Sequence, residues 1–178
     1  MEITSSSKPR PSLINKKIKT WDLKNPEKDL INNGNAVCTS SVVVSAEIIK
    51  EIKGFSENKQ LIGAEDYDCW IRIAKKTNKF KNINSSLGYW FYGNNTTNPL
   101  LTIINSEKIK NLYFKDNKNP IWYEYSINRS YYLLSEYKKA QVGIINLIFR
   151  DNVDFILRAK SCYMLIQCII RLHFRKTQ

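Results

Sequence analysis

The chain has 178 residues, the size of one domain or of one domain with a helical appendage, and is too short for two full domains. Apolar residues make up 43% and charged residues 25%, which is close to the globular average, so a packed core is expected. The formal net charge of +12 suggests nucleic acid or an anionic membrane surface as a partner.

The basic residues are spread along the whole sequence. Their runs never exceed pairs such as Lys16-Lys17 and Lys75-Lys76, whereas nucleic-acid-binding chains concentrate Lys and Arg on one stripe or arm. We therefore interpret most of the charge as a solvated surface and expect no nucleic-acid binding.

Cysteine and histidine usage argues against a zinc site and a histidine-based catalytic triad. Cys38, Cys69, Cys162 and Cys168 lack CxxC spacing, and His173 is the single histidine. The polar opening of the sequence does not resemble a signal peptide. These features predict a cytoplasmic chain with reduced thiols and no metal held by the chain alone.

The first predicted elements are an irregular segment, a strand and a helix. Residues 1–34 are polar and interrupted by prolines, with one candidate helical or extended stretch over residues 13–23. The β-branched run at 36–44 predicts a buried strand. Ser45 is placed to cap a helix over 46–53, and Gly54 to end it.

A second helix is predicted over residues 64–77. Tyr67, Trp70, Ile71 and Ala74 recur at helical spacing, so this face is expected in the core. A turn and a strand are expected within residues 79–92, then a polar loop and helices over 100–116, 121–138 and 141–174. This order predicts an α/β fold with a helical C-terminal extension.

The last predicted helix is apolar, which raises the question of whether it spans a membrane. Its longest uncharged stretch, Ser161 to Ile170, is half of the roughly 20 residues that span a bilayer, so it does not cross one. It could lie on a membrane surface or pack on the domain or a partner, and the sequence slightly favours packing. The apolar side is formed by Leu147, Ile148, Phe155, Ile156, Tyr163, Ile166 and Ile170, and the cations by Arg150, Arg158, Lys160, Arg171, Arg175 and Lys176.

An acidic cluster, Glu65-Asp66-Tyr67-Asp68, opens the second predicted helix. Carboxylates there interact favourably with the helix macrodipole, and Asp68 can pair with Arg72 one turn later. A purely structural explanation therefore exists for part of the cluster.

Three sequence blocks in a fixed order place this cluster in a wider pattern. The first runs from Asn35 through Thr39, Ser40 and Ser41 to Val44, the second is Gly54-Phe55-Ser56-Glu57, and the third begins at Glu65 and includes Trp70, Arg72 and Ala74. Together they resemble the acceptor-side half of family 2 glycosyltransferases of the GT-A fold. The resemblance covers residues 35–99, a little over a third of the chain, and implies a partial GT-A domain followed by the helical extension over 100–178.

The resemblance implies an inverting transfer of a sugar from a nucleotide sugar to a saccharide or lipid-linked acceptor, in cell-surface polysaccharide synthesis. Asp66 would be the general base that takes the proton of the acceptor hydroxyl, and Glu65 would orient it. The residues expected to form the acceptor pocket are Thr39, Ser40, Ser41, Gly54, Phe55 and Glu57.

The chain also departs from that family. It has no nucleotide-binding βαβ region and no D-x-D pair before Asn35, where Asp22 and Asp29 are isolated. Trp90 and Tyr92 occupy places where the family often has Arg and His. We expect a truncated or split enzyme, whose Mg²⁺ or Mn²⁺ would be bound only if an N-terminal half completes the site. The alternatives are a non-catalytic remnant that binds a partner or an anionic membrane and, more weakly, a basic nucleic-acid-binding protein.

Overall fold

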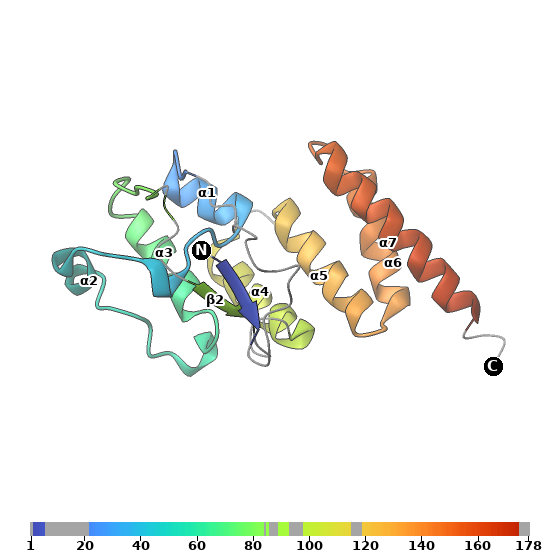
Figure 1. Ribbon diagram of the computed structural model, residues 1–178, viewed down its shortest axis with the longest axis horizontal. Helices are drawn as coiled ribbons and strands as arrows, with labels where there is room; N and C mark the ends of the chain where they lie inside the picture. The colour runs from blue at the N-terminus through green and yellow to red at the C-terminus, as the bar shows by residue number, and fades with distance from the viewer. Residues whose placement is uncertain are drawn as a thin grey trace. The chain divides into compact units, whose positions relative to one another are not determined.

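The computed structural model describes residues 2–5, 22–83, 85, 89–92, 98–114 and 119–174 (Figure 1). Helices dominate these residues, and the chain divides into two compact units, Met1–Asn98 and Pro99–Gln178. Each unit has its own set of packed elements. None of the described helices is both long enough and apolar enough to cross a membrane.

The first unit is built around one buried helix. Its elements are β1 (Glu2–Ser5), α1 (Pro26–Asn33), a 3-10 turn (Thr39–Ser41), α2 (Ala46–Glu51), a second 3-10 turn (Lys59–Leu61), α3 (Glu65–Ala74) and β2 (Tyr89–Tyr92). Helix α3 has the most buried side chains of these elements, and α1 packs against it. The hydroxyl of Tyr67 on α3 donates a hydrogen bond to the carbonyl of Leu30 on α1.

The prediction of an α/β GT-A fold is wrong. Among the described residues the only strand pairing joins β1 and β2, two four-residue strands that run parallel with Glu2 opposite Tyr89. A GT-A fold requires a larger sheet, because its parallel strands must form a layer between helices.

The predicted buried strand over residues 36–44 is also absent. Three of these residues, Thr39–Ser41, form a 3-10 turn, and the side chain of Val43 is 97% exposed. A buried strand needs a neighbouring strand for its N–H and C=O groups, and no described strand lies beside this run. β-branched composition alone therefore did not produce a strand here.

The two predicted helices of the first unit are confirmed. Helix α2 begins after Ser45, whose side chain accepts a hydrogen bond from the Glu47 N–H, and Gly54 follows it with φ of +70°. Helix α3 buries the face predicted for it, Tyr67, Trp70, Ile71 and Ala74. The interval 1–34, expected to be irregular, contains both β1 and α1, while residues 6–21 lie outside the described part of the chain.

Helix α1 has a local sequence signal that explains it. The Asn25 side chain accepts a hydrogen bond from the Lys28 N–H, Pro26 occupies the first turn, and Asp29 accepts from the Asn25 N–H at 2.9 Å. This reciprocal capping, with proline at the helix start, satisfies backbone donors that a helix N-terminus otherwise leaves open.

In the second unit, the described residues form four helices in sequence. They are α4 (Pro99–Tyr113), α5 (Ile121–Leu133), α6 (Tyr137–Ile148) and α7 (Phe155–Phe174). Consecutive helices pack on each other, with a core cluster of Tyr137, Ala140, Ile144, Met164 and Cys168 between α6 and α7. In Figure 1, α6 and α7 lie side by side.

One continuous helix had been predicted over residues 141–174, and the structure divides it. The chain leaves the helical conformation after Ile148 and resumes it at Phe155, and Asn152 adopts a left-handed conformation with φ of +61°. Asparagine tolerates this conformation better than most residues, so a turn forms within an apolar run that otherwise has helical spacing. The apolar side expected to be shared across the run is therefore split, with Leu147 buried and Phe155 exposed.

Candidate functional site

The candidate site is centred on Asp66 in the first turn of α3. Its side chain is half-buried, and Oδ1 accepts a hydrogen bond from the Tyr67 N–H at 2.6 Å. Oδ2 accepts from the Thr39 hydroxyl at 3.0 Å, across 27 positions of sequence. A carboxylate has about four lone-pair sites, so two hydrogen bonds leave it able to accept a proton.

The Thr39–Asp66 hydrogen bond brings together two of the residues predicted for the site. Thr39 comes from the first of the three sequence blocks and Asp66 from the third. Thr39 is exposed, so the hydroxyl and the carboxylate meet where a solute could reach them.

Other predicted site residues make local contacts instead. The Ser40 hydroxyl lies 3.4 Å from Cys38 Sγ, and the Ser41 hydroxyl donates to the Cys38 carbonyl at 2.8 Å. Glu65 accepts a hydrogen bond from the Gly63 N–H, and Glu57 is exposed to solvent. These contacts are local to the turns around α3, and none of them involves Asp66.

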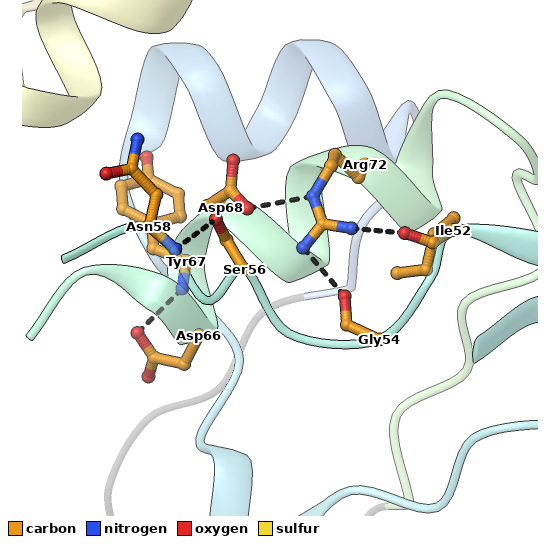
Figure 2. Close-up of polar contacts among 8 residues, drawn as sticks. All are labelled: Ile52, Gly54, Ser56, Asn58, Asp66, Tyr67, Asp68 and Arg72. Carbon is orange, nitrogen blue, oxygen red and sulfur yellow. Dashed lines mark hydrogen bonds and ion pairs between the residues drawn. The ribbon is translucent and has the colours of Figure 1, made fainter. Parts of the chain in front are cut away.

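The second block is held against α3 through Arg72. Figure 2 shows the guanidinium donating to the carbonyls of Ile52 at 2.7 Å and Gly54 at 2.9 Å, while Nε donates to Asp68 at 2.8 Å. The carbonyls belong to the end of α2, where helix geometry leaves acceptors without partners. Arg72 therefore fixes the Gly54 turn beside α3.

The aromatic side chain of the same turn completes the attachment. Phe55 packs edge-to-face on Trp70, with ring centroids 6.0 Å apart, and keeps 44% of its surface exposed. An exposed aromatic ring is a surface on which the apolar face of a sugar ring can stack.

The ion pair of Asp68 with Arg72 was predicted from helical spacing, and the structure confirms it. The contacts of Arg72 with the two carbonyls were not predicted, because residues 52 and 54 are distant from it in sequence. The sequence feature that could have indicated these contacts is the helix end expected at Gly54, because the last backbone carbonyls of a helix have no N–H donor within the helix.

Burial shifts two pKa values on α3. The pKa of the Tyr67 hydroxyl is raised by desolvation. The pKa of the Cys69 thiol is also raised, chiefly by burial and further by the charges of Asp68 and Asp66, although Arg72 opposes the shift. A buried neutral thiol of this kind is not a reactive nucleophile.

The described residues contain no cluster of three or more His, Cys, Asp or Glu side chains arranged to hold a metal ion. Trp90 and Tyr92, which replace potential ligands in the sequence pattern, belong to β2.

No protein family, curated protein or solved structure was found to match the chain.

Proposed function

We propose that this chain provides the acceptor side of a sugar-transfer site in which Asp66 is the general base. The observation that carries the proposal is that all three sequence blocks resembling family 2 glycosyltransferases are attached to helix α3. Thr39 reaches Asp66 by a hydrogen bond, and Gly54 is tied to the same helix through Arg72.

The proposed chemistry requires a base that the acceptor hydroxyl can approach. Asp66 is half-buried beside the exposed Thr39, and it retains lone pairs after its two hydrogen bonds. It would take the proton of a saccharide or lipid-linked acceptor hydroxyl while that oxygen attacks the anomeric carbon of the nucleotide sugar. The bond from that carbon to the phosphate oxygen would break, and the nucleotide would leave with the electron pair. Thr39 positions the carboxylate, and Phe55 offers a stacking surface for the acceptor.

The donor site would be supplied by a second polypeptide. No D-x-D pair precedes the first sequence block at Asn35, so we expect the nucleotide sugar and its Mg²⁺ or Mn²⁺ to be held by a complementing nucleotide-binding region. Calorimetry of the chain alone with UDP- and dTDP-sugars and Mn²⁺ is expected to show no binding at micromolar concentrations. Micromolar affinity would contradict the division of the site between two polypeptides.

Substitution of Asp66 tests the catalytic role. When the chain is mixed with a complementing donor-binding polypeptide, Asp66→Asn is expected to lower sugar transfer by about 10²–10⁴-fold, the usual contribution of a general base. Asp29→Asn is the matched control, because Asp29 is also a half-buried helix carboxylate that accepts a backbone hydrogen bond. Equal transfer by both variants would remove Asp66 from the mechanism.

A non-catalytic binding function is the second candidate. It is favoured by the absence of the predicted strand over residues 36–44, because Ser40 and Ser41 consequently contact Cys38 rather than the carboxylate. Ligand-observed NMR with a saccharide panel separates the two candidates. Saccharide binding that Phe55→Ala weakens, with no transfer under any complementation, would favour the binding function.

A further inference from the structure

Helix α7 has two faces of opposite environment. Ser161, Met164 and Cys168 are buried, and Met164 and Cys168 pack in the core cluster with α6. The opposite side, here called the outer face, carries large apolar side chains whose exposed fractions run from 42% at Ile170 to 85% at Phe155. The outer face consists of Phe155, Ile156, Tyr163, Ile166, Ile169, Ile170 and Phe174.

The outer face is continuous along the helix. With successive residues about 100° apart, its members fall within an arc of about 140° over the full length of α7. Ala159, Cys162 and His173 share this arc, so α7, which is described from end to end, presents no charged Lys, Arg, Asp or Glu there. A contiguous exposed apolar surface of this kind marks an interaction site.

Cations border the outer face on both sides. Arg158 lies beyond one edge of the arc, and Lys160 and Arg171 lie beyond the other, while the sequence of α7 contains no carboxylate. Arg171 is held in place by the Tyr137 hydroxyl at 3.3 Å and by the ring of Tyr132 at 5.6 Å. The nearest acidic residue before the helix, Asp154, already accepts a hydrogen bond from the Leu157 N–H.

A groove of about 440 Å³ extends this arrangement to α5. Its lining includes Arg129 and Lys160 together with the aromatic rings of Tyr125, Tyr132 and Tyr163. Two cations therefore stand beside apolar surface that continues into the outer face at Tyr163.

We propose that the outer face of α7 lies on an anionic membrane surface, with Arg158, Lys160 and Arg129 contacting lipid phosphates. An apolar face bordered by Lys and Arg is the pattern of helices that lie in the interface, where the apolar side chains enter the acyl boundary by about 5–10 Å. The positive charges beside the outer face favour an anionic membrane over a second copy of the chain. A second copy of the chain would bring cations against cations, with no carboxylate in α7 to pair with them.

Vesicle sedimentation of the full chain tests the proposal. Binding is expected to vesicles of phosphatidylcholine with about 30 mol% phosphatidylglycerol, to fall on adding salt, and to be at least tenfold weaker with phosphatidylcholine alone. Ile166→Glu is expected to abolish detectable binding, and Ile156→Glu to weaken it strongly.

The matched control is Ile62→Glu. Ile62 belongs to the first unit and is 68% exposed, against 65% for Ile156, so the same substitution is made at the same exposure. Wild-type binding should be retained in this variant. Far-UV circular dichroism of all three variants should match the wild type, because each replaced side chain is at least half exposed.

A second pair of variants tests how much the positive charges contribute to vesicle binding. Arg158→Gln with Lys160→Gln is expected to weaken binding by about fivefold for each charge removed, whereas Lys50→Gln with Lys59→Gln should change it little. Three results would overturn the proposal: no sedimentation with anionic vesicles, equal loss in the Ile62→Glu control, or a wild-type dimer that Ile166→Glu dissociates without any vesicle binding. Because none of these readouts involves sugar transfer, this proposal and the proposed function fail independently.

Discussion

Within each of the two units, the elements are joined by a different kind of contact. In the first, one arginine joins a helix to a distant turn: Arg72 pairs with Asp68 and donates to two carbonyls at the end of α2. In the second, consecutive helices meet mainly through apolar and aromatic side chains around Ile144 and Met164. The difference teaches that directional hydrogen bonds can fix a turn beside a helix, whereas neighbouring helices can be aligned by a packed apolar face.

The largest expected effects come from truncating the core of each unit. Ile71 and Ile144 are both completely buried. Replacing either one with alanine is expected to lower the free energy of unfolding of the protein by about 2–5 kcal/mol. Because the two residues belong to different compact units, amide hydrogen exchange should rise within residues 22–83 for Ile71→Ala and within 119–174 for Ile144→Ala. Equal acceleration in both units by either variant would show that the chain unfolds as one cooperative block.

The next effect concerns the contacts that distinguish the first unit. Arg72→Met removes the ion pair with Asp68, which is 4% exposed, and the donor to the carbonyls of Ile52 and Gly54. Since the Arg72 side chain is 26% exposed, we expect a loss of about 2–4 kcal/mol, measured by urea unfolding.

The double variant Asp68→Leu with Arg72→Met is the control for that loss. It removes the buried carboxylate that has lost its ion pair, so it should recover part of the stability, although the two carbonyls still lack their donor. A single variant as stable as the wild type would mean that the arginine contacts do not hold the turn.

The smallest expected effect concerns the close approach of α5 and α6 in the second unit. A Cβ atom at Gly143 would lie 2.0 Å from Asn128 Oδ1, and Asn128 is buried. Gly143→Ala is therefore expected to destabilise the protein by about 1–2 kcal/mol, despite the better helix propensity of alanine.

In an Asn128→Ala background the sign should reverse. With the amide gone, Gly143→Ala is expected to stabilise the protein by up to about 1 kcal/mol, the propensity difference. A double-mutant cycle in thermal unfolding measures the coupling between the two positions. Additive effects would show that the helices adjust without cost and that the contact does not limit their distance.

Local signals in the sequence determined helices α2 and α3. Ser45 and Gly54 bracket α2 through capping and a left-handed turn, and the spacing of Tyr67, Trp70 and Ile71 identified the buried face of α3. The pairing of Asp68 with Arg72 was equally predictable, because residues four apart face each other on a helix.

Non-local contacts decided what sequence pattern could not. The β-branched run at 36–44 was predicted to be a buried strand. Without a neighbouring strand, its residues Thr39–Ser41 form an exposed turn instead, and from this turn Thr39 donates to Asp66. Likewise, the continuous apolar run near the C-terminus was divided at Asn152, and packing on α6 selected which side of α7 is buried. Spacing along a chain determines which side chains share a face, but the element that covers that face is chosen only when the chain folds.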